Sequence, residues 1–265
     1  MSHLLREHAP LSDANWKLLD EEARERLEPA LGARKLVDFG GPHGWEHSAS
    51  TLGRVKKLRG GPSKAVSGLQ REVMPLVELR ADFALSREEM RDADRGAPDA
   101  ELGPLDEAAR EIAMAENVAV FHGWAGAIAG VAERSSHEAL TLGKPDSYPR
   151  PVAAAVEKLL CAGVGGPYGL ALGREQYRRV VETAEGGGYP LLDHLRKILE
   201  GPIVWTPGVN GAVVLSLRGG DFLFESGQDL SIGYDSHDAE VVRLYLQESF
   251  SFRVATPEAA VALAP

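Results

Sequence analysis

Cysteine is nearly absent from this sequence of 265 residues, because Cys161 is the only one. A single thiol excludes an intramolecular disulfide framework. Cys161 lies in an apolar run with helical spacing, so we expect a buried core thiol rather than a reactive one.

Long hydrophobic runs are absent too. No stretch approaches the roughly 20 apolar residues of a membrane span, and the opening MSHLLREHAP lacks the apolar centre of a signal peptide. We therefore expect a cytoplasmic protein without a membrane partner.

Positive charge is scarce, since 29 Lys and Arg stand against 39 Asp and Glu and give a net charge of −10. Nucleic-acid binding needs clustered basic side chains that neutralise phosphates. The one short cluster is too small, so we expect no nucleic-acid partner. It comprises Arg54, Lys56, Lys57 and Arg59. The composition is otherwise that of a globular chain, 44% apolar and 26% charged, and long enough to bury a sizeable core.

Enzyme signatures are weak or missing, and no Gly-x-Ser-x-Gly elbow occurs. His43, Glu46 and His47 match the H-x-x-E-H pattern of a zinc peptidase, which needs both histidines on one helix face. Nearby glycines and Pro42 oppose a helix, and spacing identifies no third ligand. A zinc-dependent peptidase remains an alternative only, and we assign no catalytic residue, metal or cofactor.

Two further clusters have plainer structural explanations. The segment 163–169, GVGGPYG, superficially resembles a phosphate-binding loop, but it follows a predicted helix and contains Pro167, which has no N–H. Asp235, His237 and Asp238 could hold a cation, although solvated turn residues are the default explanation.

The most informative stretch is β-rich. Residues 201–254 contain five predicted short strands separated by glycine turns. The last segment alternates apolar and polar residues, which predicts one long half-buried strand that pairs with earlier strands. Its apolar side comprises Val242, Leu244, Leu246, Phe250, Phe252 and Val254, and only Glu248 interrupts it. We expect this stretch to be scaffold rather than active site.

The N-terminal part begins with an amphipathic helix over residues 11–28, capped by Ser12. Its apolar stripe comprises Trp16, Leu19, Ala23 and Leu27. The stripe packs on the protein's own core or forms one wall of a groove for a partner, and the sequence favours the core. Residues 34–39 are predicted to form a strand that places Arg34, Leu36 and Asp38 on one face.

The middle of the chain contains a polar segment, residues 48–75, without an apolar face. This composition predicts either disorder or a two-stranded arm that finds its partners on neighbouring subunits. Residues 76–85 predict a strand, and Ser86 with Glu89 forms a capping box. A long helix is predicted over residues 104–131.

The later region, residues 140–225, mixes helix and strand. We predict helices over residues 151–163, 174–184 and 190–199 and a strand over residues 168–172. The tail, ATPEAAVALAP, is expected to lie along the surface.

Blocks spread over nearly the whole chain resemble the encapsulin shell proteins, formerly described as linocin-type bacteriocins. The blocks are HLLREHAPLSDANW, LVDFGGPHGW, FALSREEM, FHGW, GPYGLALG, YPLLDHL, GPIVW, GAVVLS, RGGDF, GQDLSIGY and LYLQESFSFRV. The resemblance implies an α+β fold of the HK97-type phage capsid kind, with a peripheral domain, an extended arm (E-loop) and an axial domain. The implied divisions are 1–47 for an N-terminal helix and first strand on the inner face, 48–75 for the arm, 76–139 for the peripheral domain with its spine helix, 140–225 for the axial domain, and 226–265 for a return to the peripheral domain and a C-terminal tail.

The resemblance also implies a function. The chain would be a structural subunit, not an enzyme, that assembles non-covalently into an icosahedral nanocompartment of about sixty copies. The compartment would enclose a dye-decolourising peroxidase or a ferritin-like iron-storage protein, for oxidative-stress or iron handling, and this cargo would dock through a C-terminal targeting peptide. The implied docking residues are Arg34, Leu36 and Asp38 with Leu230 and Ile232 opposite, and the implied five-fold pore loop is Glu185, Gly186, Gly187 and Gly188. The older family name leaves a secreted bacteriocin as an alternative, against which the missing leader speaks.

Overall fold

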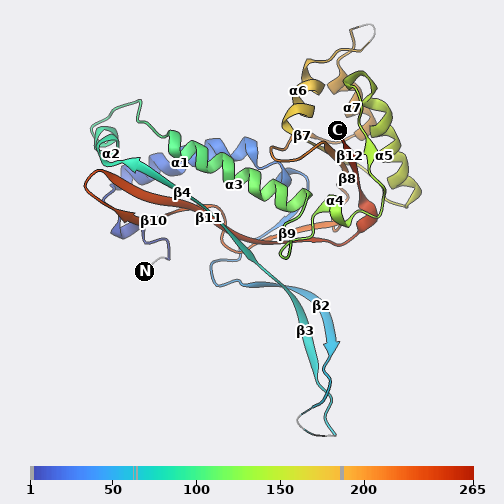
Figure 1. Cartoon of the computed structure of the whole chain (residues 1–265), viewed down its shortest axis with the longest axis horizontal. Helices are drawn as coiled ribbons and strands as arrows, with labels where there is room; N and C mark the ends of the chain where they lie inside the picture. Colours follow the sequence, from blue (N-terminus) through green and yellow to red (C-terminus); the bar gives the residue numbers. More distant parts are fainter. Residues whose placement is uncertain (1–2, 62, 64, 186–187) are drawn as a thin grey trace.

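The computed structural model describes every residue except 1–2, 62, 64 and 186–187 (Figure 1). Its strands form two five-stranded sheets and a two-stranded hairpin. The α-helices are α1 Asp13–Ala30, α2 Arg87–Asp94, α3 Gly103–Phe121, α4 Val131–Arg134, α5 Pro149–Cys161, α6 Arg174–Glu182 and α7 Leu191–Leu199. Short 3-10 helices are η1 Arg6–His8, η2 Ala33–Lys35, η3 Pro145–Ser147 and η4 Pro257–Ala259. The strands are β1 Asp38–Gly40, β2 Ala49–Lys57, β3 Leu69–Pro75, β4 Val77–Ser86, β5 Leu140–Thr141, β6 Tyr168–Leu172, β7 Ile203–Trp205, β8 Ala212–Ser216, β9 Phe222–Ser226, β10 Ser231–His237, β11 Val241–Val254 and β12 Ala260–Ala264.

The first sheet is built around β11, in the order β1-β9-β11-β10 with β4 on the other edge of β11. The predicted long final strand is confirmed, and so are the five strands between residues 201 and 254. The polar side of β11 is covered as well, because Gln247, Ser249 and Ser251 are all buried. The middle of β11 is therefore buried on both faces, whereas Arg243 near its start is exposed.

Helices α1 and α3 lie side by side over this sheet (Figure 1). Ser12 caps α1 as predicted, since its hydroxyl accepts a hydrogen bond from the N–H of Asn15. The predicted apolar stripe of α1 lies in the core that these helices share with β4, β10 and β11. The capping box before α2 is confirmed in part, because Ser86 accepts from the N–H groups of Glu88 and Glu89.

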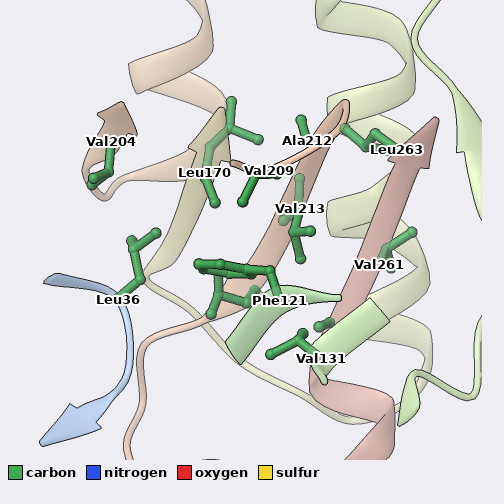
Figure 2. Close-up of a cluster of buried hydrophobic side chains, with 14 of the residues drawn as sticks. Leu36, Phe121, Val131, Leu170, Val204, Val209, Ala212, Val213, Val261 and Leu263 are labelled. Carbon is green, nitrogen blue, oxygen red and sulfur yellow. The ribbon is translucent and has the colours of Figure 1, made fainter. Parts of the chain in front are cut away.

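The second sheet has the order β5-β12-β8-β6-β7 and packs with α5 and α7. Phe121, at the end of α3, lies among Leu170, Val209 and Val213 in this second core (Figure 2). The first part of α3 contributes Leu105 to the other core. One helix therefore joins both hydrophobic cores.

The C-terminal tail is the first correction to the sequence-based predictions. It does not lie along the surface: β12 pairs with β8 and β5 inside the second sheet, and Val261 and Leu263 are buried. The alternating apolar residues of AAVALA supply an interior strand. In addition, β9 belongs to the first sheet, so the sheets change before the boundary predicted between residues 225 and 226.

The helix predicted over residues 104–131 is the second correction, because α3 ends at Phe121. Gly123 has a φ of +88°, outside the helical region. A Cβ on Gly130 would collide with the backbone of Gly123. The glycines therefore form a tight turn with a bridge between Trp124 and Ile128.

Cys161 is the third correction, since its side chain is exposed. Leu159 provides the buried contact at the end of α5. Cys161 follows two positions later, so its side chain lies on another face of the helix. Within the described chain, no helix is both long and apolar enough to cross a bilayer.

Residues 48–75 form an arm of two antiparallel strands, β2 and β3, which projects away from both sheets (Figure 1). Of the two predicted possibilities for this segment, the arm is confirmed for the residues described. Most of the arm is exposed on both faces, so the subunit itself gives little cover to most of the apolar side chains described there.

Candidate functional site

A groove of about 550 Å³ lies between α1 and the beginning of β10. Its lining comprises Asp20, Ala23, Arg24, Leu27, Glu28 and Leu31 from one wall, and Arg34, Asp229, Leu230, Ser231, Ile232 and Leu246 from the other. Leu27, Ile232 and Leu246 are buried, whereas Leu230 is half-buried. An apolar floor with charged edges can seat an apolar side chain and fix the groups beside it.

The segment before α1 connects the two walls. Arg6 forms two hydrogen bonds with Asp20 of α1, at 2.8 and 2.7 Å, and one with the carbonyl oxygen of Ile232 in β10, at 2.7 Å. Its guanidinium also lies 4.6 Å from the ring centroid of Trp16. This segment therefore limits how far α1 and β10 can separate.

Arg34 lies where η2, α3, β11 and the loop between β9 and β10 meet. Its Nε is 2.7 Å from Glu116 Oε2, its Nη1 is 2.7 Å from Asp229 Oδ1, and its Nη2 is 2.8 Å from Glu248 Oε2. The rings of Phe39 and Phe224 lie near its guanidinium, at 5.0 and 5.5 Å. The Arg34 side chain is 15% exposed, and those of Glu116 and Glu248 are 0% and 1% exposed.

The two glutamates are unusual for their degree of burial. Burial disfavours the ionised carboxylate and raises the pKa of Glu116, although Arg34 opposes this shift. The pKa of Glu248 is raised well above its ordinary value, by burial first and then by the nearby negative charge of Glu116. Glu248 interrupts the apolar side of β11 in the sequence. In the structure, its carboxyl group is bound by Arg34.

The structure brings together three of the five predicted docking residues, because Arg34, Leu230 and Ile232 line one groove. Leu36 does not: it is buried in the second core (Figure 2). Asp38 lies elsewhere as well and accepts a hydrogen bond from the N–H of Gly220, at 2.7 Å.

The strand predicted over residues 34–39 explains this difference and is largely wrong. Residues 33–35 form η2, and β1 begins only at Asp38. Arg34, Leu36 and Asp38 therefore do not share a strand face.

Sequence reasoning missed the remaining groove residues on α1, of which Arg24 and Glu28 are examples. The available signal was the apolar stripe of α1. Ala23 and Leu27 belong both to the core and to the groove lining, so this stripe packs on the core, as the sequence favours, and also lines one wall of the groove.

The H-x-x-E-H segment forms no helix in the structure. The Nε2 atoms of His47 and His43 lie 2.7 and 3.9 Å from Glu225 Oε1, and Glu46 is exposed. Across the described chain, no group of three or more His, Cys, Asp or Glu side chains could hold a metal ion. The geometry that a zinc peptidase needs is thus missing from these residues.

The other weak candidates have ordinary partners. Asp235 pairs with Arg80 at 3.1 Å, Asp238 with Arg243 at 2.8 Å, and His237 bonds to a tyrosine hydroxyl. Residues 163–167 form the turn between α5 and β6, and residues 168–169 begin β6.

The predicted pore loop lies between α6 and α7, and Gly186 and Gly187 fall outside the described residues. Hydrogen bonds join the described residues on either side of this loop. Glu185 donates from its N–H to the carbonyl of Tyr189, at 2.8 Å, and its carboxylate is 2.8 Å from Nδ1 of His194. The N–H of Gly188 donates to the carbonyl of Glu185, at 2.9 Å.

Comparison with known proteins assigns the chain to a family. The family model for the encapsulating protein for peroxidase matches residues 1–251. This chain belongs to that family. Among its relatives, the type 1 encapsulin shell protein of Rhodospirillum rubrum is 48% identical over 99% of this chain and 96% of the relative. The type 1 encapsulin shell protein of Mycobacterium tuberculosis is 40% identical over 99% of both chains.

Solved structures establish the fold of this encapsulin family member. The virus-like particle of Pyrococcus furiosus matches with a TM-score of 0.64 at 17% identity, over 93% of this chain and 98% of that one. The capsid of Myoviridae phage XM1 matches with a TM-score of 0.54 at 11% identity, over 86% and 88%. The predicted α+β fold of the HK97-type capsid kind is confirmed. The chain is a shell subunit of a multimeric, capsid-like assembly and not an enzyme.

Proposed function

We propose that this subunit forms a closed icosahedral compartment of about sixty copies in the cytoplasm, and that the compartment encloses a guest enzyme. The guest is a dye-decolourising peroxidase or a ferritin-like iron-storage protein, and the compartment serves oxidative-stress or iron handling. The name of the matched family, which refers to a peroxidase, supports the first of these guests.

The observation that carries this proposal is the groove between α1 and β10. The C-terminal targeting peptide of the guest docks there, with an apolar side chain against Leu27, Leu230 and Ile232 and its flanks near Arg24 and Asp229. The structure leads us to replace Leu36 and Asp38 by Leu27 and Arg24 in this proposed docking set.

Three other parts of the chain have proposed roles in the assembly. The arm of residues 48–75 packs on neighbouring copies, which supplies the cover that its apolar side chains lack within the subunit. The domain with the second sheet surrounds the five-fold axis, and residues 185–188 line the pore there. No metal or cofactor is part of this proposal.

The docking proposal can be tested with a fluorescent protein that carries the C-terminal targeting peptide of the proposed guest enzyme. Leu230→Glu places a carboxylate in the groove, and unpaired burial of that charge costs more than ~1.4 kcal/mol, so guest content should fall at least about tenfold. Ser236→Glu adds the same charge to β10 outside the groove lining and should load normally.

Shell formation is checked on the same samples by size exclusion and negative-stain microscopy. Both variants should form particles like those of the wild type. Equal guest content in Leu230→Glu and wild-type shells would refute docking in this groove.

A further inference from the structure

The two buried glutamates beneath the groove each leave one oxygen without a donor. Glu116 and Glu248 both use Oε2 to bind Arg34, whereas their Oε1 atoms are buried and unsatisfied. Both carboxyl groups bind the one guanidinium of Arg34, at 2.7 and 2.8 Å, so they lie close to each other and each affects the pKa of the other. Ionised carboxylates only accept hydrogen bonds, so a bond between them requires a proton on one of the two.

The charge balance favours the same conclusion. The charged groups that face this pair among the described residues are Arg34, from η2, and Asp229, from the loop between β9 and β10. The aromatic rings of Phe39 and Phe224 flank the guanidinium and offer no further positive charge. One cation cannot compensate three carboxylates, and two buried carboxylates in contact do not both ionise near neutral pH.

We propose that Glu116 and Glu248 share one proton at neutral pH, and that this proton controls how firmly the groove holds its occupant. The second half of the proposal rests on the proposed docking function. With the proton bound, the pair carries one negative charge, so Arg34 and the two buried glutamates are together neutral and only the partly exposed Asp229 adds a negative charge. When the proton passes to solvent, two negative charges face each other between α3 and β11.

The position of Glu248 connects this repulsion to the groove. β11 pairs with β10 up to Gln247 and with β9 from Phe250, so Glu248 lies where the partner strand changes. The loop between β9 and β10 is bound to β11 at this point, because Ser249 exchanges backbone hydrogen bonds with residues 227 and 228. That loop continues into Asp229 and Leu230, which line the groove. A displacement of β11 from α3 therefore moves a groove wall away from α1.

The direction of the coupling follows from the charges. The protonated pair keeps the wall in place and holds the guest, and loss of the proton at alkaline pH releases it. The coupling is reciprocal, so a bound guest also strengthens proton binding. A difference of one pKa unit between empty and occupied grooves corresponds to a tenfold difference in guest affinity.

Infrared spectroscopy of wild-type shells tests the shared proton directly, because a protonated carboxyl group absorbs at a higher frequency than a carboxylate. A band of a protonated carboxyl should persist at about pH 7 and disappear on titration to alkaline pH. It should be absent in Glu248→Gln, whose amide mimics the protonated acid, and present in Glu240→Gln, which changes an exposed glutamate in the turn before β11. A wild-type spectrum without this band at neutral pH would overturn the proposal, whether or not the variants fold.

Guest retention tests the control of the groove. Shells loaded with the fluorescent protein that carries the targeting peptide are dialysed between about pH 6 and about pH 9, and the retained fluorescence is measured. Wild-type and Glu240→Gln shells should lose guest about tenfold more at the alkaline end, whereas Glu248→Gln shells should show no such difference.

The outcomes separate this inference from the proposed function. Equal pH dependence in Glu248→Gln and wild-type shells would refute the control by the proton. A guest that loads at no pH would refute docking in the groove and its control together, and the shared proton would then be judged by the infrared band alone.

Discussion

At the scale of single residues, polar groups on α3 fix the joint between the two sheets. Asn117 is fully buried. Its side chain accepts from the N–H of Ala33, at 2.9 Å, and donates to the carbonyls of Ala30 and Pro207, at 2.9 and 3.0 Å. One amide thus satisfies backbone groups from the end of α1, from η2 and from the loop between β7 and β8.

His122 binds the same loop and makes the joint sensitive to acid. Its Nε2 accepts a hydrogen bond from the N–H of Asn210, at 2.9 Å, which only a neutral imidazole can do. Burial lowers the pKa of His122 from its ordinary value of 6.5. The unfolded chain therefore binds this proton more tightly than the folded one, and stability falls as the pH drops below about 6.5.

The prediction is that His122→Gln loses less stability between about pH 7 and about pH 5 than the wild type, because glutamine accepts the same bond without titrating. The unfolding temperature of each protein is measured at both pH values. His8→Gln, at an exposed position, should behave as the wild type. An acid-induced loss that is the same in all three proteins would contradict this role of His122.

The glutamate pair changes the stability of the protein with pH in the opposite direction. Because the folded protein raises the pKa of Glu248, it binds that proton more tightly than the unfolded chain does. The contribution of this group therefore declines as the pH rises above the ordinary pKa of a glutamate. Acid weakens the joint at His122, whereas alkali weakens the site at Arg34.

At the scale of helices and strands, local sequence predicted those elements whose pattern agrees with their surroundings. α1 has a cap and an apolar stripe, and β11 has an alternation that only Glu248 interrupts on its apolar side. Residues 34–39 alternate too, but η2 places Arg34 against carboxylates that are 82, 195 and 214 positions away in the sequence. No local pattern contains those partners.

The candidate groove was predictable to a similar extent. Arg34, Leu230 and Ile232 were correctly expected to lie together. Leu36 was wrongly placed with them, because its burial depends on the close approach of Gly169, which no local pattern shows. The tail was misjudged for a related reason. Its alternating small residues resemble a surface segment until β8 and β5 are placed beside it.

The interior position of the tail leads to a prediction at this scale. Leu263 in β12 is 1% exposed, so Leu263→Ala should leave a cavity and reduce stability by about 2–5 kcal/mol. Leu160→Ala is the matched control, because Leu160 on α5 is 59% exposed and its truncation should cost about 0.5 kcal/mol or less. Thermal unfolding of both variants measures the difference. Similar unfolding temperatures would contradict an interior β12.

At the scale of the whole molecule, the distribution of charge separates the arm from the rest. The arm carries Arg54, Lys56, Lys57, Arg59 and Arg71 but only one acidic residue among those described, whereas the whole chain has a net charge of −10. Opposite charges steer association and fix the register between partners. A basic arm and an acidic body therefore favour contacts between copies over nucleic-acid binding.

The apolar side chains of the arm suggest where the assembly is most easily interrupted. Leu69 in β3 is 63% exposed in the subunit, and Val55 and Val73 are exposed on the same face of the hairpin. If neighbouring copies cover these side chains, Leu69→Asp replaces an apolar contact by a carboxylate at every copy of the interface, and its desolvation opposes assembly even with Lys57 opposite it. Because the proposed icosahedral shell repeats that contact in all its subunits, a cost of a few kcal/mol per copy should prevent closure.

We therefore predict that Leu69→Asp remains folded, with the circular dichroism of the wild type, but elutes as a small species by size exclusion. Leu69→Met keeps an apolar side chain of similar size and should still form large particles. The subunit should tolerate both changes because Leu69 contributes nothing to either hydrophobic core. Particles of wild-type size and yield from Leu69→Asp would show that the exposed side of the arm is not buried between copies.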